Sequence, residues 1–170
     1  GRKALADGFH GYTPAKGLLP VRESVARYCM RFHKAKHVSP DDVLIVPGGK
    51  PTMFFAIMLF GEPGTEILYP NPGFPIYESA IKFSGATPVP IPLVEEKGFA
   101  FDVDETLGKI TPRTRLLIVN TPANPTGGVV PKNELDRLVA GLEKLPHVAV
   151  MCAAIYSRLL YDGEQHTSIL

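Results

Sequence analysis

The hydrophobic pattern of the chain switches repeatedly between helix-like and strand-like segments. From Leu18 to Phe32, apolar side chains such as Val21 and Val25 recur every three or four positions, which predicts an amphipathic helix. Further helices are predicted at residues 51–60, 76–84 and 132–144. Short apolar runs predict strands at residues 42–47, 66–69, 87–93, 115–120 and 147–152.

This alternation predicts an α/β fold, with a mostly parallel sheet and helices on both faces. Uniformly apolar strands such as residues 115–120 are typical of parallel sheets that are buried on both sides. Pro88, Pro90 and Pro92 favour an edge position, or merely an extended segment, for residues 87–93. In such folds the functional loops follow the carboxyl ends of the strands.

Composition narrows the class of protein. The 170 residues are 45% hydrophobic and 21% charged, and 18 basic against 17 acidic residues leave a net charge of +1. These values exclude disorder and give no electrostatic case for nucleic acid as a partner.

The longest apolar stretch, Met53 to Phe60, is too short to span a bilayer, so we expect no membrane partner. Cys29 and Cys152 lie far apart and show no metal-ligand spacing, so we expect no metal site and a reducing, cytoplasmic location.

Three strand-end loops carry candidate chemistry. Residues 47–52 (PGGKPT) join a predicted strand to a helix, where close backbone approach and free N–H groups favour a phosphate, although such turns also occur for steric reasons alone. Residues 71–77 (NPGFPIY) present Phe74, either as a flat face for a planar heteroaromatic ligand or as a plug for the sheet's end. Residues 120–128 (NTPANPTGG) form a rigid connection that fixes the Asn124 amide at the sheet's edge.

Five segments, in this order, are similar to motifs of the class I/II aminotransferases, which are pyridoxal-phosphate enzymes of fold type I. The aspartate aminotransferase branch is the closest likeness. The segments are residues 11–23 (GYTPAKGLLPVRE), 48–50 (GGK), 71–74 (NPGF), 120–127 (NTPANPTG) and 155–161 (IYSRLLY). The resemblance implies that residues 1–38 lead into a large cofactor-binding domain and that residues 39–170 are the first part of that domain. The rest of the large domain and the small domain are expected to be absent, as in an N-terminal-half fragment.

The resemblance also implies a site for pyridoxal 5′-phosphate. Gly49 and Lys50 match positions whose backbone N–H groups bind the cofactor's phosphate. Phe74 matches the aromatic residue that stacks on the pyridine ring and borders the substrate. Asn124 would contact both the substrate's carboxylate and the phenolic oxygen of the cofactor.

Two tyrosines complete the implied site. Tyr156 matches the residue that bonds the phenolic oxygen together with Asn124. Tyr12 matches a residue that reaches the phosphate across a subunit interface, which implies a homodimer. The uncovered edge and apolar helix faces of half a sheet also predict association.

Transfer of an amino group between an amino acid and a 2-oxo acid is the implied reaction of the complete protein, with aspartate as the first candidate. Ala153 stands where the family carries the aspartate that pairs with the pyridine nitrogen. The Schiff-base lysine lies beyond Leu170 in the family, so we expect no catalytic residue and no activity in this chain alone. A fold type I lyase or synthase is one alternative. A non-catalytic or engineered fragment that serves as a binding or assembly module is another alternative. The pair Ala153–Ala154 is either a plain buried strand end or an engineered or degenerate site.

Overall fold

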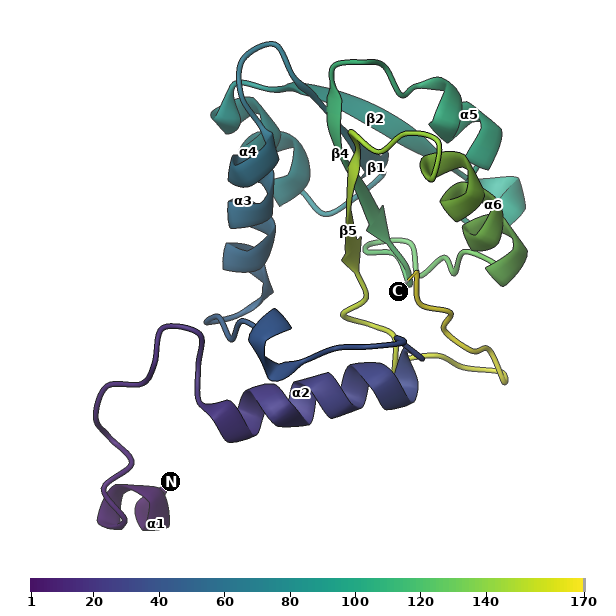
Figure 1. Cartoon of the computed structure of the whole chain (residues 1–170). Helices are drawn as coiled ribbons and strands as arrows, with labels where there is room; N and C mark the ends of the chain where they lie inside the picture. Colours follow the sequence, from purple (N-terminus) through teal and green to yellow (C-terminus); the bar gives the residue numbers. More distant parts are fainter. Residues whose placement is uncertain (170) are drawn as a thin grey trace. The chain divides into compact units, whose positions relative to one another are not determined.

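The computed structural model describes residues 1–169, which separate into two compact units, residues 1–48 and 49–169. The first unit contains two helices and a short 3-10 turn: α1 (Arg2–Ala6), α2 (Leu19–Phe32) and η1 (Pro40–Asp42) (Figure 1). Within the described residues no helix is both long and apolar enough to cross a membrane. The division into an N-terminal segment and a cofactor-binding domain stays a prediction.

Helix α2 confirms the amphipathic helix predicted from the sequence. It begins with Pro20 in its first turn, where the missing N–H removes no intrahelical bond. The Arg22 guanidinium ties the helix to its surroundings, because Nη1 donates to the carbonyl of Pro40 at 2.8 Å and Nε donates to that of Gly17 at 3.2 Å.

The strand predicted at residues 42–47 is wrong. This segment follows η1 and is not part of any strand among the described residues. Ile45 donates its N–H to the carbonyl of Lys16 at 3.0 Å. Leu44 is 62% exposed, unlike a side chain in the middle of a parallel sheet. Apolar composition predicted burial correctly only for Val43, and a strand also needs a neighbour with which to form a backbone ladder.

The second unit is built on a five-stranded sheet with the order β3-β2-β1-β4-β5. Its strands are β1 (Glu66–Asn71), β2 (Thr87–Val94), β3 (Ala100–Phe101), β4 (Thr114–Asn120) and β5 (Ala149–Ala153). All neighbouring pairs are parallel except β2 with β3. The helical elements are α3 (Gly49–Phe60), α4 (Ile76–Ser84), η2 (Glu95–Lys97), α5 (Val103–Gly108) and α6 (Lys132–Leu142). The predicted α/β fold with a mostly parallel sheet is confirmed.

Side chains alternate between two apolar clusters, one on each face of the sheet. On β1, Ile67 packs into the cluster under α3 and α4, whereas Leu68 packs into the cluster under α5 and α6. On β4, Leu116 and Leu117 divide in the same way. Figure 1 shows α3 and α4 on one side of the sheet and α5 and α6 on the other. Burial on both faces explains why these strands read as continuous apolar runs.

The prolines of β2 explain its position near the edge. Thr87 donates its N–H to the Thr65 carbonyl at 2.9 Å, so the odd-numbered residues of β2 bond toward β1. Pro88, Pro90 and Pro92 fall on the alternate positions and face away from β1, where the lack of an N–H costs no ladder bond on that side. The outer side of β2 is met by the two-residue strand β3.

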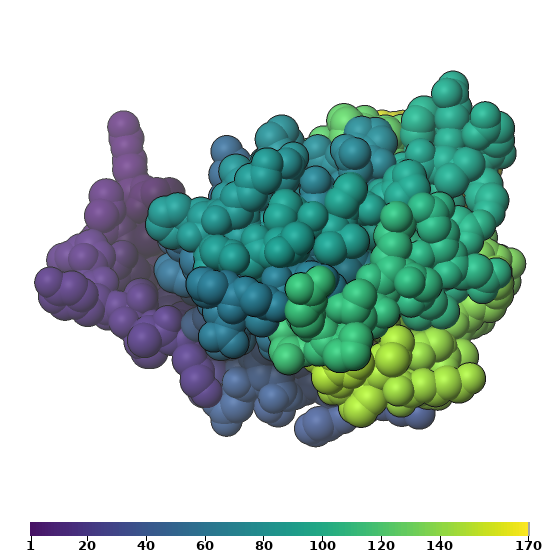
Figure 2. All heavy atoms as spheres, turned by 90° about the horizontal axis from the view of Figure 1, so that it is seen from above, coloured from purple at the N-terminus to yellow at the C-terminus, as the bar shows by residue number. Residues whose placement is uncertain are grey.

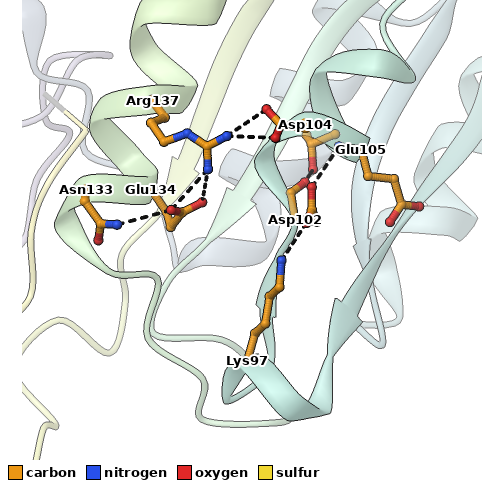
Figure 3. Close-up of polar contacts among 8 residues, drawn as sticks. Lys97, Asp102, Asp104, Glu105, Asn133, Glu134 and Arg137 are labelled. Atoms are coloured by element: carbon orange, nitrogen blue, oxygen red, sulfur yellow. Dashed lines mark hydrogen bonds and ion pairs between the residues drawn. The ribbon is translucent and has the colours of Figure 1, made fainter.

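Charged side chains join α5 to α6 on the surface of the second unit (Figure 3). Arg137 donates to both carboxylate oxygens of Asp104 at 2.8 Å and to Glu134 at 2.9 Å. Asp102 caps α5, and the backbone N–H of Glu105, together with the Lys97 ammonium, lowers the pKa of Asp102 to about 2. In Figure 2 the teal-to-green residues, which include β2 and α5, form one continuous surface of this unit.

Candidate functional site

The connections of the sheet place a crevice at the carboxyl ends of β1 and β4. The β1–β2 connection crosses one face through α4, and the β4–β5 connection crosses the other face through α6. Loops therefore leave β1 and β4 in opposite directions, and this switch point is where doubly wound sheets bind ligands. A cavity of about 370 Å³ lies there, lined by residues at or just after the carboxyl ends of β1, β4 and β5 and by the beginning of α3.

Five of the six residues predicted for the site line this one cavity. They are Gly49, Lys50, Phe74, Asn124 and Tyr156. The three loops selected from the sequence therefore converge, although residues 47–52 do not follow a strand.

Tyr12, the sixth predicted residue, lies in the first unit. Its side chain is fully exposed there. Its contact with a phosphate across a subunit interface stays a prediction.

The first turn of α3 forms one end of the cavity. Gly49 and Lys50 begin the helix, and N–H groups in a first turn have no acceptor within their own helix. The positive end of the helix dipole adds to this, so the position favours an anion. The Lys50 ammonium lies 6.0 Å from the centre of the Phe74 ring, at the outer limit of a cation–π contact.

The loop after β1 holds the Phe74 ring in a defined orientation. A Cβ atom on Gly73 would lie 2.1 Å from the carbonyl oxygen of Pro70, so this turn accepts only glycine without moving the backbone. Phe74 then packs edge-on against Tyr77, with ring centres 6.1 Å apart and an angle of 77° between the rings. Packing against the buried Tyr77 holds the aromatic side chain at the cavity wall.

The polar side of the cavity is made by Asn124 and Tyr156. The Asn124 amide nitrogen donates to the Tyr156 hydroxyl at 3.3 Å, between residues that are 32 positions apart in the chain. Gly128 closes the loop that carries Asn124, because its carbonyl accepts the N–H of Ala123 at 2.9 Å. A Cβ atom on Gly128 would lie 2.6 Å from the carbonyl oxygen of Gly98, so the loop favours glycine there. Both side chains carry donors, so the pair suits an anionic oxygen as a ligand.

The cavity wall is otherwise neutral. Burial, with Tyr156 and Cys152 nearby, raises the pKa of Tyr77 to about 12, and burial also raises the pKa of the Cys152 thiol. Both groups are therefore protonated at neutral pH. Of the described residues that line the cavity, Lys50 alone has a charged side chain, and Ala153 brings a methyl group rather than a carboxylate.

The structure adds cavity residues to which the sequence reasoning gave no role. Tyr77 and Asn120 are buried polar residues, and Met53 and Met151 supply apolar wall. Tyr77 follows Phe74 by three positions in the next helix, and Asn120 ends a strand immediately before a proline-rich loop. The position of Asn120 was a signal visible in the sequence, because a polar residue at the carboxyl end of a parallel strand lies at the ligand-binding edge of the sheet. The signal for Tyr77 was its place three residues after Phe74.

Comparison with known proteins defines the class of protein. The family model for aminotransferase class I and II matches residues 2–170. The aspartate/prephenate aminotransferase of Thermus thermophilus is 35% identical over 163 residues, which cover 96% of this chain and 42% of the relative. The structure of the alanine aminotransferase from Pyrococcus furiosus superposes with a TM-score of 0.92 at 30% identity, covering 99% of this chain and 42% of that one. The N-succinyldiaminopimelate aminotransferase from Mycobacterium tuberculosis gives a TM-score of 0.91 at 32% identity, with 99% and 44% coverage.

The fold is thus that of part of an α/β large domain of fold type I. The chain belongs to the class I and II aminotransferases, which are enzymes that use pyridoxal 5′-phosphate, and the resemblance inferred from its motifs is confirmed. The chain spans less than half the length of the curated relatives that it matches.

Proposed function

We propose that the cavity binds pyridoxal 5′-phosphate and that the complete protein transfers an amino group between an amino acid and a 2-oxo acid. The observation that carries this proposal is the convergence of a helix N-terminus, an aromatic ring and an amide–phenol pair in one cavity. Aspartate is the first candidate substrate. The printed names of the similar proteins include aspartate/prephenate, alanine and N-succinyldiaminopimelate aminotransferases, so the choice of aspartate rests on the motif resemblance.

The residues present fit a flat, phosphorylated ring. A volume of about 370 Å³ falls within the range of roughly 300–1,000 Å³ that is usual for small-molecule sites. The first turn of α3 suits a phosphate, and the Phe74 ring suits one face of an aromatic ligand. Asn124 and Tyr156 suit the phenolic oxygen.

When bound, pyridoxal phosphate supplies a conjugated ring that accepts the electron pair of a substrate bond. The chain's own residues bind and orient it. In the proposal, the N–H groups of Gly49 and Lys50 hold the phosphate, and Phe74 fixes the plane of the ring. Asn124 and Tyr156 donate hydrogen bonds to the phenolic oxygen, which stabilises its anion. Asn124 also contacts the substrate's carboxylate.

The proposed partner is a second copy of the chain. On α3 and α4 of the second unit, Phe55, Leu59 and Phe83 are 65%, 77% and 75% exposed. Three large apolar side chains on adjacent helices favour association. A second copy would also supply the predicted contact of Tyr12. Size-exclusion chromatography with light scattering is expected to give a dimer or a larger assembly, and a monomer at micromolar concentration overturns this part of the proposal.

The cytoplasmic location also stays a proposal, based on sparse cysteine usage.

For this chain alone, the cavity favours binding without catalysis. Lys50 provides the only side-chain amine among the described residues that line the cavity, and its proposed role uses its backbone. The chain by itself is therefore proposed to act as a binding module, with weak affinity for the cofactor. A long-wavelength absorption band that persists after gel filtration, as expected for covalent attachment to a lysine, would contradict this.

Titration of the chain with pyridoxal phosphate, followed by ligand absorbance and protein fluorescence, tests the proposed site. Saturable binding is expected, with competition by inorganic phosphate and much weaker binding of pyridoxal, which lacks the phosphate. Phe74→Ala is expected to weaken binding, whereas Phe9→Ala, at a side chain that is 75% exposed in the first unit, serves as the control. Equal affinities for pyridoxal and pyridoxal phosphate, or no effect of Phe74→Ala, overturn the assignment.

A further inference from the structure

We propose that Asn120 is a positioning residue, whose single buried amide holds Asn124 and Tyr156 at the distance needed to act together on a ligand. The inference rests on the proposed function, because it concerns how that site is held in shape. Asn120 is the last residue of β4 and is 7% exposed.

Every hydrogen-bonding atom of this amide has a partner with suitable geometry. Its oxygen accepts the backbone N–H of Asn124 at 3.0 Å. Its nitrogen donates to the carbonyl of Pro122 at 3.1 Å and to that of Ala153 at 2.8 Å. Only this orientation of the amide satisfies one N–H donor and two carbonyl acceptors at once.

These bonds lie at the place where the backbone ladder stops. The parallel register of β4 and β5 ends with the pair Asn120 and Ala153. Beyond this pair, the segment that follows β4 continues to Asn124, and the segment that follows β5 continues to Tyr156. The Asn120 amide therefore adds a side-chain link between the two segments at the last pair of the strand ladder.

The link acts on both members of the polar pair. Asn124 is held by its own backbone N–H, and Tyr156 is held through Ala153, three residues earlier. The contact between the two side chains, at 3.3 Å, is long for a hydrogen bond, so it does little to hold the loops itself. A small displacement of either loop would break this contact.

The chemistry at position 120 requires two donors and one acceptor. Asn120→Asp keeps the size of the side chain but replaces the donor nitrogen with an oxygen, which faces the carbonyls of Pro122 and Ala153. Asn120→Ser keeps one donor and one acceptor on a shorter side chain and is the milder change. Asn133→Asp makes the same chemical change at an exposed position of α6 and serves as the matched control.

A double-mutant cycle on the 170-residue chain tests the positioning role, with pyridoxal phosphate as the probe. Asn120→Asp is expected to weaken binding by at least tenfold in the otherwise unchanged chain. In a Tyr156→Phe background the same change is expected to weaken binding by a smaller factor, because one of the two groups that Asn120 positions, the Tyr156 hydroxyl, is already missing and only Asn124 remains. Equal losses in both backgrounds would assign Asn120 a general structural role and overturn the proposal. Asn133→Asp is expected to leave the affinity unchanged.

A measurement without ligand separates this inference from the proposed function. Hydrogen exchange of the Asn124 amide is expected to be at least tenfold faster in Asn120→Ala, which removes the oxygen that accepts this N–H, while the amide of Leu117, in the middle of β4, keeps its protection. Unchanged exchange at Asn124 overturns the link whether or not the cofactor binds. Absence of binding by the unchanged chain, with faster exchange in the variant, refutes only the proposed function. Where Asn120→Asp or Asn120→Ala does not fold, Asn120→Ser replaces it, with smaller effects of the same sign.

Discussion

Removal of the Tyr156 hydroxyl is the most direct test of the polar side of the cavity. Tyr156→Phe leaves the ring in place and deletes one oxygen, the acceptor of the hydrogen bond from Asn124 at 3.3 Å. In the proposed complex this hydroxyl donates to an anionic oxygen, and a hydrogen bond to a charged group contributes about 1.5–3 kcal/mol. Since 1.4 kcal/mol corresponds to a tenfold change, pyridoxal phosphate should bind roughly 10–100-fold more weakly.

The same change should affect folding much less. A neutral hydrogen bond at a partly buried site contributes about 0.5–1.5 kcal/mol, so urea unfolding should move by that amount at most. Binding is measured by fluorescence titration and stability by circular dichroism in urea. Tyr161→Phe is the matched control, because Tyr161 is 77% exposed and does not line the cavity. If Tyr156→Phe alters the affinity by less than twofold while the chain remains folded, the assignment of this hydroxyl to the ligand is wrong.

Three further changes test the cavity wall and the core. Ala153→Asp places a carboxylate on the cavity wall and, in the proposed complex, should raise the pKa of the bound ring nitrogen. The absorbance titration of bound pyridoxal phosphate should then shift to higher pH. An unchanged midpoint contradicts the placement of the ring. Burial raises the pKa of Cys152, so its thiolate should form only at higher pH. In a Cys29→Ser background, the midpoint of the pH profile for iodoacetamide alkylation should lie at higher pH than that of a small free thiol. Coincident profiles contradict this. Leu138→Ala removes a side chain of 0% exposure from the cluster under α6 and should lower the free energy of unfolding by about 2–5 kcal/mol in urea, whereas a loss below about 1 kcal/mol would show that this core is loosely packed.

The helices show where local patterns are sufficient. Residues 76–84 were predicted as a helix, and α4 has the same bounds. Its end follows from local chemistry, because Gly85 adopts a φ of 86° and caps the helix in the left-handed conformation that glycine favours. Predictions of this kind depend on neighbours three or four positions away, all of which are visible in the sequence.

The strands show where local patterns are insufficient. Residues 42–47 and 115–120 are both apolar, yet only the second segment forms a strand, β4, between β1 and β5. Apolar composition reports that a segment avoids water and says nothing about which partner, if any, supplies its backbone hydrogen bonds. Those partners come from segments tens of residues away.

For the site, the amino-acid sequence was enough to select the loops, the family and the residues Gly49, Lys50, Phe74, Asn124 and Tyr156, because glycine turns, proline-stiffened loops and helix starts are local features with known chemistry. The folded chain was needed to bring these residues into one cavity and to reveal the link through Asn120. The amide of Asn120 and the carbonyl that it binds are 33 positions apart, and nothing local relates them. Their meeting depends on the register of two parallel strands, which long-range packing establishes.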